Sequence, residues 1–101
     1  MMEVQKHTAE MTAKWGLSND AMARYADLVS EIGELGKELV VGTNYGKSPL
    51  TSNKSLNMEM GDVIFSLALF ANALGLDMEK CFAMTIEKCH RRMAEKGHIG
   101  S

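Results

Sequence analysis

Acidic residues recur at helical spacing in the first half of the chain. Steps of four, three and four residues place the carboxylates of Asp27, Glu31, Glu34 and Glu38 within about 60° on one helix face. Neighbouring like charges at this spacing repel by about 0.2–0.5 kcal/mol per pair. Lys37 lies about 60° or more off the stripe and is a single positive charge. The pattern therefore indicates a compensating cation from outside the chain.

A second acidic step, Glu59 and Asp62, opens a much more apolar segment. Carboxylate oxygens on two facing helices are the ligands that hard divalent cations prefer, so the two steps predict a site for Mg²⁺, or Mn²⁺ in its place. In this interpretation Glu31, Glu34, Glu59 and Asp62 are metal ligands. Glu31 and Glu34 are also the expected catalytic residues, of which Glu31 is expected to orient the attacking water, and Glu38 is a candidate for a second metal or its water. The alternatives are a solvated acidic face for the first step and compensation of a helix dipole for the second.

Basic residues gather near the end of the chain, at Lys88, Arg91 and Arg92. At helical spacing they span about 100° next to an apolar face, which is compatible with binding phosphate groups. The competing interpretation is the usual excess of cations near a helix C-terminus. Trp15 is a candidate platform for a nucleobase, although a tryptophan at such a position is more often part of a core.

Four helices are expected. The first covers about 3–15 and ends at Gly16 in a left-handed cap, and the second runs from caps at 18–20 to about residue 41. Glycine, asparagine, serine and proline then mark a loop over 42–56. A third helix is expected over about 57–74, and a fourth, capped by Asp77, reaches about residue 95 before a tail at 96–101.

Apolar residues mark the faces that we expect to be buried. The second helix carries an apolar stripe that the acids flank: Tyr25, Leu28, Val29, Ile32, Leu35 and Leu39. The third helix is apolar on almost every face, so it is expected to be central or covered by a partner subunit. On the fourth helix the inward positions are expected to be Met78, Phe82, Ile86, Cys89 and Met93. No strand-like alternation appears, and the fold class is therefore all-α, an antiparallel four-helix module assembled as a dimer or tetramer.

Bulk properties narrow the classes of function. A chain of 101 residues is expected to form one domain, 1–101, and its net charge of −2 gives no electrostatic reason to bind nucleic acid or an anionic membrane. Cys81 and Cys89, eight residues apart on one expected helix, are poorly placed to pair or to share a zinc ion. The Glu-x-x-His step of di-iron bundles occurs once, at Glu87 and His90, where two are needed. No leader or spanning segment is evident, and a cytoplasmic protein is expected.

The two acidic steps resemble the ExxE and ExxD motifs of the MazG-like nucleotide pyrophosphohydrolases, the all-α NTP pyrophosphatase superfamily. The stretches EIGEL at 31–35 and EMGDV at 59–63 are close to the family wording, as are Gly75-Leu76-Asp77 and the basic segment around Lys88. The similarity runs from about Trp15 to Arg92. Two departures occur: Ser30 stands where many relatives have a further glutamate, and Cys89 follows Lys88 where relatives often have asparagine.

The resemblance implies a four-helix module that works as a dimer or a dimer of dimers. It also implies Mg²⁺-dependent hydrolysis of a (deoxy)nucleoside triphosphate to the monophosphate and pyrophosphate, as in housecleaning of the nucleotide pool, with Lys88 as the foremost phosphate-binding residue. Two alternatives stay open. One is a phosphoribosyl-ATP or dUTP/dCTP-specific pyrophosphatase of the same fold, and the other is a non-catalytic helical oligomerisation module.

Overall fold

The chain folds into four α-helices in a computed structural model that describes residues 2–51 and 54–101. In chain order they are α1 (Met2–Trp15), α2 (Ala21–Gly42), α3 (Lys54–Ala73) and α4 (Met78–Lys96). No strand occurs within the described ranges. The all-α prediction and its four helices are confirmed.

Local capping chemistry sets several of the helix ends. The Asp20 carboxylate accepts a hydrogen bond from the Ala23 amide at 2.9 Å, and Asp77 accepts from the amides of Glu79 and Lys80 at 3.0 and 3.3 Å. These bonds satisfy amide groups that have no partner inside a helix. After α1, Gly16 adopts φ +63°, the left-handed conformation that glycine tolerates best. The predicted caps at these three positions are confirmed.

The connection between α2 and α3 is shorter than the loop expected over 42–56. Helix α2 extends through Gly42 and α3 already begins at Lys54. The chain turns directly after α2, where Asn44, Tyr45 and Gly46 all have positive φ values of 49°, 59° and 82°. Residues 52 and 53 of the expected loop lie outside the described ranges.

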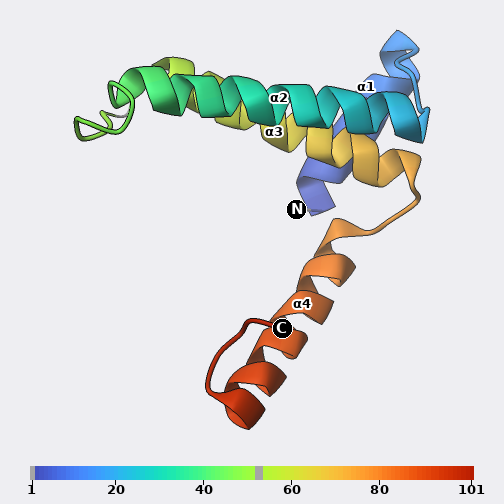
Figure 1. The fold of residues 1–101 in the computed structure, drawn as a ribbon. Helices are drawn as coiled ribbons and strands as arrows, with labels where there is room; N and C mark the ends of the chain where they lie inside the picture. Colours follow the sequence, from blue (N-terminus) through green and yellow to red (C-terminus); the bar gives the residue numbers. More distant parts are fainter. Residues whose placement is uncertain (1, 52–53) are drawn as a thin grey trace.

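Helices α2 and α3 form an antiparallel pair that lies side by side along most of its length (Figure 1). Leu28 of α2 and Leu69 of α3 are buried. The rings of Tyr25 and Phe70 also join the two helices, with centroids 5.7 Å apart and a tilt of 50°. This pairing brings the acidic face of α2 toward the start of α3.

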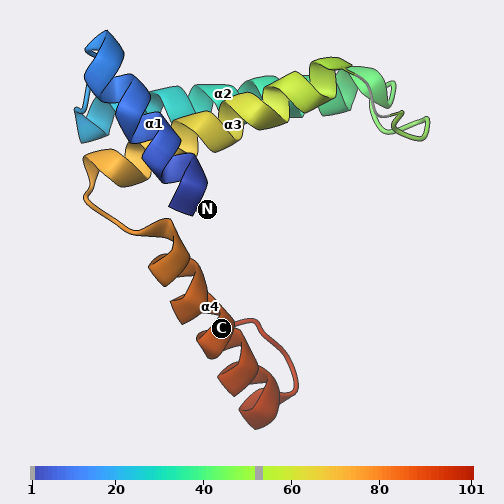
Figure 2. The ribbon, with the colours of Figure 1, turned by 180° about the vertical axis from the view of Figure 1, so that it is seen from behind.

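Helix α1 crosses α3 on the side away from α2 (Figure 2). The small side chains of Ala68 and Ala71 are buried on α3 and form a core with Met78, against which Val4 packs. Gln5 then links three elements: its Nε2 donates to Asn72 Oδ1 at 3.0 Å and to the Leu76 carbonyl at 2.7 Å, and its Oε1 accepts from the Met78 amide at 2.7 Å. Gln5 therefore fixes the point at which α4 starts.

Helix α4 leaves the other three instead of closing a bundle (Figure 1). It is bent by 99° from α3 across the connection at residues 74–77. Of its expected inward residues only Met78 is buried, whereas Phe82, Ile86 and Met93 are 56%, 41% and 53% exposed and Cys89 is half-buried. For a single chain, the prediction of a closed antiparallel bundle with these residues inside is wrong. Local periodicity identifies an apolar face but does not say which surface covers it.

Among the described residues, none of the helices alone combines the length and the apolar character of a membrane span. The bent pair of α3 and α4 meets the criteria of length and composition when the two are taken together.

Candidate metal centre

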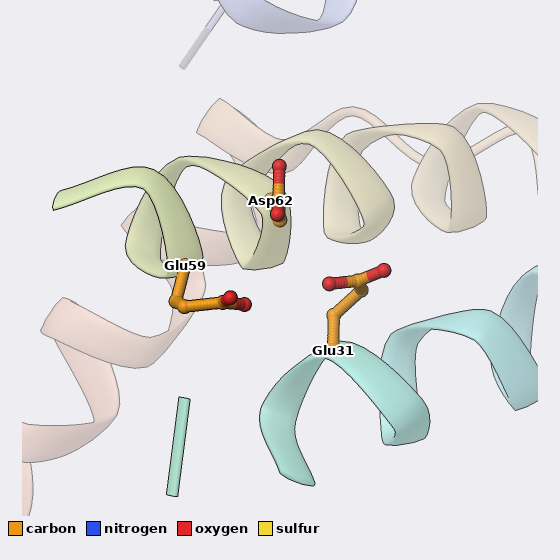
Figure 3. Close-up of side chains that lie close together, drawn as sticks. All are labelled: Glu31, Glu59 and Asp62. Carbon is orange, nitrogen blue, oxygen red and sulfur yellow. The ribbon is translucent and has the colours of Figure 1, made fainter. Parts of the chain in front are cut away.

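Three carboxylates meet in the space between α2 and α3. Glu31 comes from the middle of α2, and Glu59 and Asp62 come from the first half of α3. One oxygen atom from each lies within 4.8 Å of those from the other two. Figure 3 shows Glu59 extending toward the Glu31 carboxylate, with Asp62 one turn further along α3. Residues three apart share a helix face, and the antiparallel pairing of the helices supplies the third group.

Uncompensated negative charge characterises this carboxylate cluster. Partial burial raises the pKa of the Glu59 carboxyl, and the neighbouring charges of Asp62, Glu34, Glu31 and Glu38 raise it further, in that order. No positive charge contributes to this shift. Since each of the three clustered residues offers oxygen ligands, the group suits a hard divalent cation such as Mg²⁺ or Mn²⁺ better than a softer metal.

Glu34 and Glu38 lie near the cluster but do not belong to it. Both add to the negative field at Glu59, yet neither has an oxygen within the 4.8 Å group. Glu34 is exposed and Glu38 is half-buried. Of the four residues predicted as metal ligands, the structure thus brings together Glu31, Glu59 and Asp62 and leaves Glu34 at the edge.

Asp27 has a different environment from the other acids of the stripe. Its Oδ2 atom accepts a hydrogen bond from Nη1 of Arg24 at 3.2 Å, one turn earlier on α2. Arg24 is anchored in turn, because its Nε donates to the Ser18 carbonyl at 2.7 Å. This pair was not predicted from the sequence, although the spacing of three residues between opposite charges is a signal that indicates it.

The basic residues of α4 lie far from the cluster within one chain. At a rise of about 1.5 Å per residue, about 16 Å of α3 and about 15 Å of α4 separate Asp62 from Lys88, and the two helices are bent by 99° from one another. Arg92 is also directed elsewhere, since its Nη1 donates to the Ile99 carbonyl in the tail at 3.3 Å. Lys88 and Arg91 share a surface hollow of about 560 Å³ whose other lining residues are Cys81, Met84, Thr85 and Glu87.

Trp15 lies at the C-terminal end of α1 and is 57% exposed. Its ring is therefore not part of the core, which was the competing interpretation. The carboxylate cluster comes from α2 and α3, whereas Trp15 belongs to α1. A role for Trp15 or for the α4 cations in binding substrate stays a prediction.

A hollow of about 390 Å³ lies between α1 and α3, on a different face of α3 from the carboxylate cluster. Gly61, which precedes Asp62, forms part of its wall. The other lining residues are Glu3, Val4, His7, Thr8, Met11, Ile64 and Phe65. This hollow was not predictable from local sequence patterns, because the crossing of α1 over α3 joins residues nearly sixty positions apart.

Comparisons with known proteins give one family and one curated relative. The model of the MazG nucleotide pyrophosphohydrolase domain matches residues 19–96, which include both acidic steps and α4. A protein of Bacillus subtilis (strain 168) named "Uncharacterized protein YpjD" is 35% identical over 74 residues, 70% of this chain. The match spans 65% of that relative's length. No solved structure matches the chain.

Proposed function

The chain belongs to the MazG nucleotide pyrophosphohydrolase family, and from that premise we propose that it hydrolyses a (deoxy)nucleoside triphosphate to the monophosphate and pyrophosphate. The observation that carries the proposal is the carboxylate cluster of Glu31, Glu59 and Asp62, whose oxygens approach within 4.8 Å. Four acids that raise the pKa of Glu59, without a cation among them, make a site that repels phosphates unless positive charge is added.

Glu31, Glu59 and Asp62 would hold Mg²⁺, or Mn²⁺ in its place. The ion would supply Lewis acidity toward the phosphate oxygens and offset their charge. Oxygen-only donors on two helices fit the preference of Mg²⁺ for a few carboxylates together with substrate phosphates. Removing the ion would leave the cluster and a triphosphate mutually repulsive.

Glu34 is suited to orient the attacking water. It lies one helical turn from Glu31, close enough to influence Glu59, and its carboxylate is exposed. A carboxylate that is not a ligand is free to accept a proton from water as the water attacks a phosphorus atom. This assignment gives Glu31 the role of ligand and Glu34 the role of base, whereas the sequence alone favoured Glu31 as the base.

The hollow between α1 and α3 would take the nucleoside part of the substrate. Its walls are mainly apolar, with His7 able to meet a base edge or face. We expect His7→Ala to raise KM for the preferred nucleotide while changing kcat little, and an unchanged KM would place the base elsewhere.

The decisive experiment measures pyrophosphate release from a panel of canonical and modified nucleoside triphosphates with Mg²⁺. Release that stops in excess EDTA and returns with added Mg²⁺ is expected. Activity confined to dUTP, dCTP or phosphoribosyl-ATP would favour the narrower pyrophosphatases of this fold. A folded protein that releases no pyrophosphate from any of them would favour a non-catalytic oligomerisation module and overturn the proposal.

A further inference from the structure

Ser66 is a polar residue in the buried part of α3. It is 7% exposed, and among the described residues Thr8 is the other polar residue that is buried. The Thr8 hydroxyl donates to the Val4 carbonyl, whereas the Ser66 hydroxyl has no hydrogen bond to any residue in the described part of the chain. A nearly buried hydroxyl without a partner is unfavourable, which indicates that it serves a ligand or a charged neighbour.

Helical spacing directs Ser66 toward α2 and the carboxylate cluster. At about 100° per residue, Ser66 lies within about 20° of Glu59 and about 40° of Asp62 around the axis of α3. Phe70 lies about 40° to the other side of Ser66, and its ring contacts Tyr25 of α2. Ser66 therefore belongs to the strip of α3 that faces α2.

The antiparallel register places Ser66 across from Glu31. The ring contact pairs Tyr25 of α2 with Phe70 of α3. Glu31 follows Tyr25 by six residues, and the point six residues before Phe70 lies midway between Asp62 and Ser66. Each of these two residues is then about 3 Å from the level of Glu31 along the helix axis. Figure 3 agrees, because the Glu31 carboxylate lies past Asp62 toward the later turns of α3.

The chemistry of the groups sets the direction of their contact. An ionised carboxylate only accepts hydrogen bonds, so the Ser66 hydroxyl has to donate to it. Glu31 reaches the cluster on a long, flexible side chain from the opposite helix, and this side chain has to be ordered before it can hold an ion. A donor that holds one carboxylate oxygen leaves the other for the ion and strengthens metal binding.

We propose that the Ser66 hydroxyl donates a hydrogen bond to the Glu31 carboxylate when the divalent ion is bound, and so fixes the orientation of this ligand. Ser66 is then a positioning residue, because it acts on the ion through Glu31. The inference rests on the proposed function for the presence of the ion, but its test requires no turnover.

Mn²⁺ titration without nucleotide tests the role of Ser66. The electron paramagnetic resonance signal of free Mn²⁺ gives the affinity, and Ser66→Ala is expected to weaken it about tenfold or more. Ser30→Ala removes a hydroxyl beside Glu31 on the exposed side of α2 and is expected to leave the affinity within about twofold. An affinity for Mn²⁺ that Ser66→Ala leaves unchanged would overturn the inference.

Thermal melts in EDTA separate positioning from a merely structural role. Alanine favours a helix and leaves no unpaired hydroxyl, so the Tm of metal-free Ser66→Ala is expected to equal or exceed that of the wild type. A structural role predicts the reverse, a lower metal-free Tm with unchanged Mn²⁺ affinity. That result would also overturn the inference.

A double-mutant cycle tests whether Ser66 acts through Glu31. In a Glu31→Ala background, Ser66→Ala is expected to change the Mn²⁺ affinity by less than about twofold, whereas in an Asp62→Asn background it keeps its effect of about tenfold. A tenfold effect that persists without the Glu31 carboxylate would overturn the assignment. The expected coupling in a protein that releases no pyrophosphate would support the inference while the proposed function fails.

Discussion

Asp27 and Glu31 are alike in the sequence but differ in the structure. Both lie on the acidic face of α2, four residues apart. The Arg24 guanidinium neutralises Asp27, whereas Glu31 faces the carboxylates of Glu59 and Asp62. The same side chain chemistry therefore gives a surface ion pair at one position and a candidate metal ligand at the next turn. This contrast supplies a matched pair of substitutions.

Asp62→Asn is expected to lower kcat/KM by about a hundredfold or more, equal to about 2.7 kcal/mol of transition-state stabilisation, because it removes one ligand and its charge. Asp27→Asn makes the same chemical change in the paired acid and is expected to leave kinetics within about twofold, since exposed ion pairs contribute little. Steady-state kinetics with Mg²⁺ and circular dichroism of both variants decide the matter. If both variants lost the same factor in kcat/KM, Asp62 in the carboxylate cluster would be no more important for activity than Asp27 outside it.

Glu59→Gln is expected to stabilise the metal-free protein at neutral pH. Because the folded state raises the pKa of Glu59, the favourable contribution of its neutral form is complete below the ordinary carboxyl pKa and is lost as pH rises through the raised value. The Tm of the metal-free wild type should thus fall relative to that of Glu59→Gln as the pH rises above the ordinary carboxyl pKa of about 4. Thermal melts in EDTA measure this difference. If the Tm values of the wild type and of Glu59→Gln changed in parallel with pH, the charge on Glu59 would not be unfavourable in the folded state.

At the scale of the helices, Gln5 determines where α4 begins. One side chain on α1 bonds to the Asn72 side chain, the Leu76 carbonyl and the Met78 amide, while Asn72 Nδ2 donates back to the Gln5 carbonyl at 3.2 Å. The Met78 amide belongs to the first turn of α4, where an amide has no partner inside the helix. Gln5 therefore ties α1 to the connection that sets the 99° bend.

Gln5→Ala is expected to lower the free energy of unfolding by about 1–3 kcal/mol, because three hydrogen bonds are lost and the Met78 amide loses its acceptor. Lys6→Ala, at the next position of α1 and exposed, is the control and should change stability by less than about 0.5 kcal/mol. Urea unfolding of both variants measures the difference. If Gln5→Ala unfolded at the same urea concentration as the wild type, the hydrogen bonds of the Gln5 side chain would not stabilise the start of α4.

At the scale of the whole molecule, the chain buries too little to resemble a self-sufficient domain. Its buried apolar residues are Leu28, Ala68, Leu69, Ala71 and Met78, and among the described residues none of the larger side chains is completely buried. Such a core offsets little of the conformational entropy of 101 residues. Association with a second copy would supply the burial that the single chain lacks.

Phe82→Glu is expected to convert the expected dimer to a monomer, because a charge would then replace the largest apolar group of the exposed strip on α4, which consists of Phe82, Ile86 and Met93. Ile99→Glu makes a comparable change at a 55% exposed residue of the tail and should leave the dimer intact. Light scattering at micromolar concentration gives the mass of each variant. A Phe82→Glu protein that keeps the wild-type mass would show that the strip lies outside the interface.

The sequence alone determined what depends on neighbouring residues. The caps at Asp20 and Asp77, the turn at Gly16 and the sharing of one face by Glu59 and Asp62 all follow from groups within four positions of one another. Helix bounds and acidic motifs were therefore predictable, and the family match supports the same motifs. Tertiary structure decided which acids meet across α2 and α3, because that depends on how each helix is rotated and shifted against the other. It also decided the direction of α4, because a four-residue connection held by Gln5 from α1 sets a bend that no periodicity within α3 or α4 encodes.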